Sequence, residues 1–190
     1  MNCRRAMTWV HDPCIESPRT FSFPRAHGPE VGKRETHIMT TVSDAELDEL
    51  ESRMDEAAKA YINGGVRRYM ELFDHPDDYT LMAPYGGQTH HGFSPTDEDI
   101  EVTSRFFVSG QATLEVEQRY ASGDLAVLVA VERQRGQVGD FAEQDWSLRV
   151  TIVFRRVGDR WQIVHRHADP LVREISFNHC AELARGLTTA

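Results

Sequence analysis

The sequence predicts an α+β domain in which a curved antiparallel sheet is folded around helices to make a central pocket. Helical periodicity is confined to residues 43–110. After Gly110 the hydrophobic period changes to two, and four strand-like runs follow one another. Helices followed by a meander of strands are typical of an α+β arrangement.

The first helix begins at a capping box, Ser43-Asp-Ala-Glu46, in which each end residue can satisfy a backbone amide of the other. Apolar residues then recur at helical spacing as far as Ile62, and Asn63-Gly64-Gly65 ends the helix. A second, short helix over 66–73 is stopped by His75-Pro76. The sequence therefore predicts two consecutive helices joined by a glycine turn.

The segment that follows predicts a strand over Tyr79–Ala83 and a glycine-rich loop over Pro84–Gly92. Ser94 and Pro95 predict the N-cap and first turn of a third helix that ends near Gly110. Glycine turns at Gly123 and Gly158 separate the later strands. The four strands are expected over Thr113–Ala121, Asp124–Arg135, Asp145–Arg156 and Arg160–Ala168.

Three domain segments are expected. Residues 1–40 hold four of the eight prolines and show no periodicity, which predicts a disordered tail or an over-extended start, with Met39 as the alternative first residue. A basic targeting peptide is the rival interpretation of this segment. Residues 41–172 form the domain, and 173–190 a final helix or tail.

Composition excludes several classes of function. The net charge of −9 argues against a nucleic-acid partner. No apolar run approaches the roughly 20 residues that span a bilayer, so no membrane partner is expected. Three cysteines argue against a disulfide framework and predict a reducing, cytoplasmic location.

The order of these elements resembles a known superfamily. Gly64-Gly65, Leu72-Phe73, Pro84-Tyr-Gly and His91-Gly92 follow the first half of NTF2-like domains. The ending, from Arg149 to Asp169, is similar to their SnoaL-like and ketosteroid-isomerase-homologue branch, which is DUF4440-like, and also to the association domain of calmodulin-dependent kinases. The resemblance implies a cone-shaped pocket and a homodimer, but no single chemistry.

The resemblance does not extend to the groups that a ketosteroid isomerase needs. That enzyme, a worked case for tuned carboxyl groups, uses a tyrosine, a carboxylate base and a protonated aspartate. Counting from Gly64, Pro84 and Trp161 places these roles at Ala57, Ala83 and Thr151. None of the three can perform them, so no steroid isomerisation is expected. If the chain is an enzyme, an isomerase, cyclase or hydratase-like activity is implied instead.

The same alignment gives Arg149, Thr151 and Val153 the parity of the pocket, with Val164 and Arg166 on the last strand. Two arginines in one partly apolar cavity would suit a small apolar organic acid, because the guanidinium fork matches a carboxylate. The alternative is that both arginines pair with acids such as Glu115 or Glu117, or lie at a wet rim.

Further ligand-binding candidates are His91, Tyr61 and Tyr85. His91 is expected to anchor the loop at the pocket mouth rather than act as a base, and a packing role for Tyr61 is equally open. His165 and His167 could ligate a metal with His90 and His91. Their parity with Trp161 and Ile163 places them on a packing or dimer face instead, so neither metal nor cofactor is expected.

Two functions remain open from the sequence. One is a small-molecule pocket protein, and the other is a non-catalytic homodimerisation module with an incidental pocket. The dimer is expected through a sheet face that would be too apolar to remain in water. This face carries Leu148, Val150, Ile152, Phe154, Trp161 and Ile163.

Overall fold

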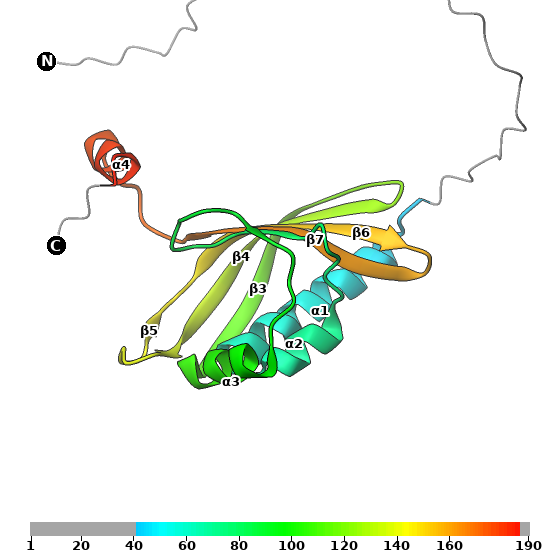
Figure 1. Cartoon of the computed structure of the whole chain (residues 1–190). Coiled ribbons are helices and arrows are strands. Elements are labelled where there is room, and N and C mark those ends of the chain that lie inside the picture. The colour runs from blue at the N-terminus through cyan, green and yellow to red at the C-terminus, as the bar shows by residue number, and fades with distance from the viewer. Residues whose placement is uncertain (1–40, 187–190) are drawn as a thin grey trace, which may run out of the picture. The chain divides into compact units, whose positions relative to one another are not determined.

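The computed structural model describes residues 41–186, so the expectations for residues 1–40 lie outside the described part. Helices α1 (Asp44–Ile62), α2 (Val66–Leu72) and α3 (Asp97–Phe106) lie on one side of a curved sheet, as Figure 1 shows. Helix α4 (Phe177–Ala184) follows the last strand, and none of its residues is buried. No described helix is long and apolar enough to cross a membrane.

The sheet has the order β2-β1-β7-β6-β4-β3, with the short strand β5 paired to β4. All neighbouring pairs are antiparallel except β1 and β7, which run parallel, so the sheet is mixed rather than purely antiparallel. The strands are β1 (Thr80–Met82), β2 (His90–His91), β3 (Phe107–Ser122), β4 (Leu125–Val138), β5 (Gln144–Asp145), β6 (Leu148–Val157) and β7 (Arg160–Pro170).

Local signals at the helix ends were informative in one case and misleading in another. The capping box of Ser43 and Glu46 is present at the start of α1. Helix α3, however, begins after Thr96, which forms its own capping box with Asp99, and not after Ser94. The helix ends at Phe106 and the chain continues directly into β3, so the predicted end near Gly110 is wrong.

The apolar positions of β6 face the helices and not a partner subunit. Val150, Ile152 and Phe154 are buried together with Leu50 and Met54 of α1. The prediction that these β6 residues form an exposed dimer face is therefore wrong. Alternation along a strand shows that two faces exist, but the layer that covers a face decides which one is buried.

Strand β7 changes parity within its length. Ile163 pairs with Phe154, whereas His165 pairs with Val153, so Val164 is an extra residue in the ladder. This irregularity reverses the face of every later residue, as a β-bulge does. Trp161 and Ile163 therefore lie in the core, and Arg166 returns to the same inner side.

Candidate functional site

The inner face of the sheet carries a charged pair in otherwise apolar surroundings. Arg166 on β7 donates from Nη2 to Oε2 of Glu132 on β4, at 2.7 Å. The two side chains are only 15% and 5% exposed. Arg166 faces inward because it pairs across the ladder with the buried Ile152. Glu132 faces inward because it continues the alternating buried positions of β4, which are Ala126, Leu128 and Ala130.

Glu132 is fully engaged by protein groups. One carboxylate oxygen accepts from Arg166, and the other accepts from the side-chain amide of Gln134. A carboxylate with both oxygens held in this way is poorly placed to take a proton from a ligand. Glu132 therefore neutralises Arg166 rather than acting as a free base.

Arg166 retains one unused donor group. Its Nη1 atom is buried and has no hydrogen-bond partner among the described residues. Burial alone would lower the pKa of this guanidinium, but Glu132 and the neighbouring tyrosines Tyr69 and Tyr79 outweigh burial and raise it. Arg166 is thus a charged side chain whose Nη1 meets no hydrogen-bond acceptor among the described residues.

Three tyrosines lie within electrostatic reach of this charge. Burial raises the pKa of Tyr79 to about 12, and the charge of Arg166 opposes that rise. Burial likewise raises the pKa of Tyr61 and Tyr69, each again within electrostatic reach of Arg166. All three phenols are therefore protonated at neutral pH and can donate hydrogen bonds.

His75 completes the polar part of the interior. Its Nε2 lies 3.0 Å from the hydroxyl of Tyr69. Burial lowers the pKa of His75 to about 4, although a hydrogen bond to the backbone of Phe73 opposes the effect. The imidazole is consequently neutral at pH 7, and the Tyr69 hydroxyl is already committed to it.

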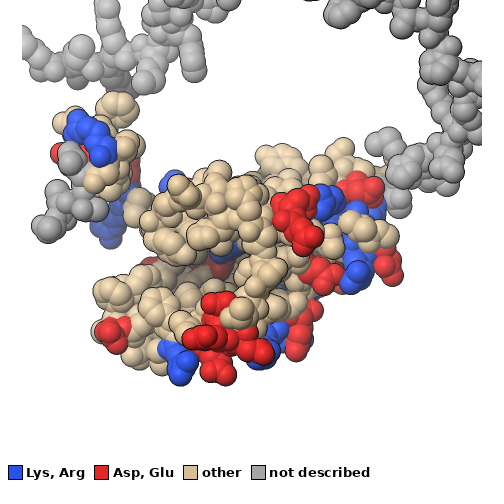
Figure 2. Space-filling view, in the orientation of Figure 1, with Lys and Arg blue, Asp and Glu red and all other residues tan. Residues whose placement is uncertain are grey.

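Aromatic rings form the remaining wall. The centroid of Phe93 lies 4.5 Å from that of His75 and 6.2 Å from that of Tyr79. Tyr61 packs edge-on against Phe107 at 4.8 Å. Figure 2 shows that the molecule is hollowed on this side, between α3 and the strands above it.

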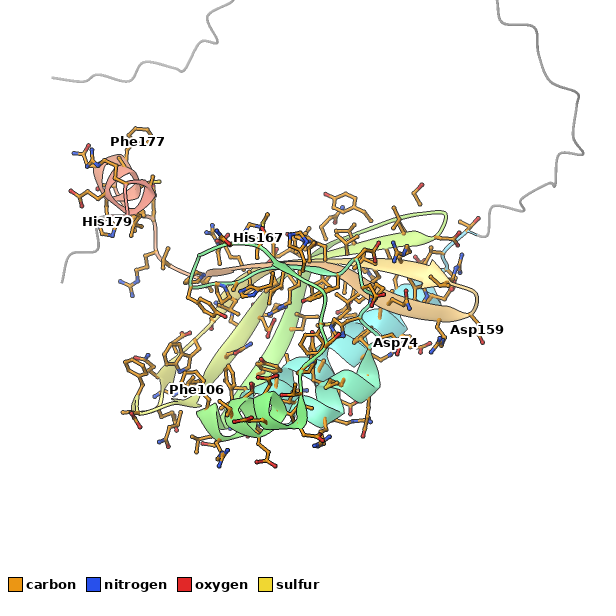
Figure 3. All side chains as sticks on the ribbon, viewed as in Figure 1. Asp74, Phe106, Asp159, His167, Phe177 and His179 are labelled. Atoms are coloured by element: carbon orange, nitrogen blue, oxygen red, sulfur yellow. The ribbon has the colours of Figure 1, made fainter. Side chains whose placement is uncertain are left out.

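Arg149 and Arg166 do not meet, because they lie on opposite faces of the sheet. Arg149 pairs across the ladder with Asp169, and Thr151 pairs with His167. These four residues line a groove of about 230 Å³ on the outer face, and Figure 3 shows His167 on the side of the sheet away from the helices. The expected convergence of two arginines is wrong, since the alignment assigned the wrong face to β6.

The other predicted site residues divide between the interior and the exterior. Tyr61 belongs to the interior, and Tyr85, 83% exposed, is close enough to contribute to its raised pKa. His91 is exposed on β2 and pairs with Thr80, whose hydroxyl contacts Nδ1 of His165 at 2.8 Å. It does not join the interior group.

Two other possibilities carry no comparable chemistry. A groove of about 380 Å³ lies beside Gly64, Ile100 and Arg105, but its Arg67 is already paired with Asp97 on the open surface. Within residues 41–186, no group of three or more His, Cys, Asp or Glu is arranged to hold a metal ion.

Sequence reasoning missed Glu132, His75, Tyr79 and Phe93. One signal could have revealed Glu132, because it occupies the apolar parity of β4. A charged residue in such a position is rarely buried without a partner. His75 was interpreted only as part of a helix stop, and nothing local in the sequence indicates that it is enclosed by rings.

Comparison with known proteins agrees with this architecture. The family model of the SnoaL-like domain matches residues 50–172. An NTF2-like protein from Streptomyces avermitilis, described as a candidate dehydratase, is 17% identical with a TM-score of 0.55, over 68% of this chain and 99% of that one. No curated protein matches the sequence.

Two further solved structures are similar. An NTF2-like protein of unknown function from Pseudomonas putida is 24% identical, with a TM-score of 0.51 over 70% of this chain and 92% of that one. A candidate calcium/calmodulin-dependent protein kinase II association domain from Xanthomonas campestris is 18% identical, with a TM-score of 0.50 over 70% and 91%. At these identities the likeness shows the NTF2-like fold alone.

Proposed function

Since the chain belongs to the SnoaL-like family of NTF2-like domains, we propose that it binds a small, mainly apolar molecule inside the cone, against Arg166. The observation that carries the proposal is the buried Nη1 of Arg166, which has no acceptor among the described residues. Leaving a buried donor unsatisfied costs about 1–3 kcal/mol, and more for a charged group. A ligand that accepts from this atom recovers that free energy on binding.

The surroundings of Arg166 support a ligand rather than a purely structural pair. A structural ion pair is most favourable when all its polar atoms are satisfied. Here each oxygen of Glu132 accepts a hydrogen bond, whereas the buried Nη1 of Arg166 donates none to the described residues. The side chains of Tyr61, Tyr69 and Tyr79 are also within electrostatic reach of Arg166. The ring of Tyr69 packs edge-on against those of Tyr61 and Phe93, so this part of the interior is aromatic.

The prediction of an organic acid loses its main support. It depended on two arginines in one cavity, and only Arg166 is on the inner face. The sequence left open the alternative that Arg166 pairs with a carboxylate, and the structure shows such a pair. The partner is Glu132, not Glu115 or Glu117. We still propose a pocket for a small molecule, but a carboxylate is no longer the polar group that we expect this molecule to carry.

We also propose that steroid isomerisation is not the reaction. Ala57 and Ala83, aligned with two of the catalytic groups, are buried apolar residues. Thr151, aligned with the third, lies on the outer face. An activity of another kind would have to use Tyr61, Tyr79 or Arg166, the polar side chains of the interior that retain free donors.

The test is to locate bound ligands on the protein. The full chain is screened against small aromatic fragments by thermal shift, and hits are mapped by amide chemical-shift perturbation. We expect perturbations near Tyr61, Tyr79 and Arg166. Perturbations confined to Arg149 and Asp169 on the outer face, or no hit at all, would contradict the proposal.

A homodimer is the second candidate, and the outer face of the sheet favours it. Four valines on this face are only half-buried, and no described element covers them: Val127, Val129 and Val131 of β4 and Val153 of β6. Adjacent β-branched side chains of this kind form an apolar strip that a second copy could cover. This face, and not the one predicted from the sequence, is the proposed interface.

A further inference from the structure

We propose that the apolar face of helix α4 docks in the groove on the outer sheet face of a second copy of this chain. The inference depends on the homodimer proposed above, because it names the segment of the second copy that covers this face. Each copy then gives its own α4 and receives the other, as an exchange of identical elements requires. The two faces of α4, the size of the groove and the connection between them support it.

Helix α4 has two unlike faces. At about 3.6 residues per turn, its apolar side chains form one contiguous face: Phe177, Cys180, Ala181, Leu183 and Ala184. The opposite face carries Asn178, His179 and Glu182, and the last two lie 3.6 Å apart as an ion pair when His179 is protonated. Figure 3 shows Phe177 and His179 on opposite sides of the helix. The pattern is typical of a helix that packs one face and keeps the other in water.

The apolar face of α4 is not covered within one chain. Phe177 is 88% exposed and Leu183 is 54% exposed, and no residue of the helix is buried. The hydroxyl of Ser176 accepts from the amide of His179, which fixes where the helix begins. A helix this short is nevertheless marginal in water, because nucleation costs more than its few hydrogen bonds return. Packing against another surface has to supply the rest of its stability.

The outer face of the sheet offers a groove that suits side chains of a helix. It has a volume of about 230 Å³ and is lined by Val129 and Val131 of the apolar strip, together with Arg149, Thr151, His167 and Asp169. Pockets that enclose a small molecule are larger, at roughly 300–1,000 Å³. Arg149 and Asp169 already lie 3.9 Å apart as an ion pair. The groove therefore favours an apolar side chain over an ion or a small molecule.

The connection to α4 begins at this groove but does not return to it. Asp169 lines the groove, and only residues 170–176 separate it from α4. The amide of Leu171 donates to the carbonyl of Ser147 at 2.8 Å, which holds the chain beside the start of β6. Residues 172–176 are exposed and α4 has no buried residue, so the chain does not cover its own groove with α4. We therefore assign the groove to the α4 of the second copy.

The first experiment measures the dissociation constant of the dimer by sedimentation equilibrium of the full chain. Phe177→Asp places a charge on the apolar face of α4, and Asn178→Asp places the same charge on its polar face. Both positions lie in the first turn, where an acidic residue favours a helix, so neither variant should lose α4. Phe177→Asp should raise the dissociation constant by about tenfold or more, and Asn178→Asp should leave it unchanged.

These measurements separate the docking of α4 from the dimer itself. If the wild-type chain is a monomer at micromolar concentration, the homodimer fails and this inference fails with it. If the wild-type chain is a dimer and the two variants dissociate equally, the dimer stands, but α4 is no part of its interface.

The second experiment locates α4 by a disulfide bond. Cys180 is exposed on the apolar face of α4, so it can react with a thiol introduced by Thr151→Cys in the groove. The background carries Cys3→Ser and Cys14→Ser, and the matched control is Val102→Cys, at an exposed position of α3. After mild oxidation, peptide mapping should find Cys180 joined to position 151 of another chain, in a covalent dimer. The control should form no such bond.

The pattern of disulfide bonds decides which chain fills the groove. A bond from Cys180 to position 151 of the same chain would show that α4 covers its own groove, which overturns the second copy as the occupant. No bond to position 151, or bonds to positions 151 and 102 in equal yield, would show that α4 does not dock in this groove.

Discussion

Arg166 and Glu132 are 34 positions apart in the sequence and lie on strands that are not neighbours, yet Nη2 and Oε2 are 2.7 Å apart. Strand β6 runs between β7 and β4, so the pair reaches across the inner face of an intervening strand. A second buried cation of the inner face, Arg156 of β6, pairs instead with Glu46 of α1 at 2.8 Å. The contact between Arg166 and Glu132 links the stability of the sheet to the chemistry of the interior.

Removing one partner of this pair should be strongly destabilising. Arg166→Ala leaves a buried carboxylate without its cation, and we expect a loss of about 3–5 kcal/mol in the free energy of unfolding. The measurement is equilibrium denaturation in urea. The matched control is Arg133→Ala, because Arg133 pairs with Glu115 at 2.8 Å with both side chains about half exposed.

The control should cost only about 0–1 kcal/mol, as exposed pairs do. Replacing both buried partners, as in Arg166→Met with Glu132→Leu, should recover much of the loss, because no unpaired charge remains. Equal small losses for Arg166→Ala and Arg133→Ala would show that the inner pair is hydrated and contributes little.

His75 should make stability depend on pH below neutrality. Its pKa is about 4 in the folded protein and 6.5 in the unfolded chain. As pH falls from 6.5 towards 4, the unfolded chain takes up the proton first, so the free energy of unfolding falls. The loss from this residue is on the order of 3 kcal/mol by pH 4.

The measurement is urea denaturation of wild type and His75→Phe at pH 7 and pH 4.5. Phenylalanine keeps a ring against Phe93 and removes the titrating group. The drop in stability between the two pH values should be smaller in the variant by about 2–3 kcal/mol. Identical drops would show that His75 is charged or exposed in the folded protein; His179→Gln in α4, where nothing is buried, is the control.

Gly64 should be intolerant of any side chain. Its φ is +71°, which L-residues rarely adopt, and an added Cβ would lie 2.4 Å from the carbonyl oxygen of Ser104 in α3. Gly123 has a similar φ of +58° but faces open space. Gly64→Ala combines backbone strain with a clash against backbone, whereas Gly123→Ala carries the strain alone.

Thermal denaturation of the two variants checks this comparison. Gly123→Ala should cost on the order of 1 kcal/mol, and Gly64→Ala should cost several times as much, because α3 has to move. If the two variants melt at the same temperature, the turn before α2 can separate from α3 without penalty.

The proposed dimer can be tested on the outer face. Val129→Arg places a charge in the middle of the apolar strip on β4 and should convert a dimer to a monomer, measured by multi-angle light scattering at micromolar concentration. Val157→Arg, at an exposed position at the end of β6, is the control and should leave the assembly unchanged. A wild-type chain that is already monomeric at this concentration would rule the dimer out.

Local signals were enough for the element types. The capping box of Ser43 and Glu46 specifies the start of α1 because both groups lie within one turn of helix. Gly123 and Gly158 adopt positive φ in the hairpins, as turns of this kind require. The order of helices and strands followed, and with it the α+β fold class.

The sequence by itself therefore determined which segments are helices and strands, and that each strand has two unlike faces. Only the tertiary structure decided which face meets α1, because a period of two is the same whichever way the strand is turned. The extra residue at Val164 reversed the parity of β7 without a sequence signature. For that reason Arg166 meets Glu132 on the inner face of the sheet, while Arg149 lies with Asp169 on the outer face.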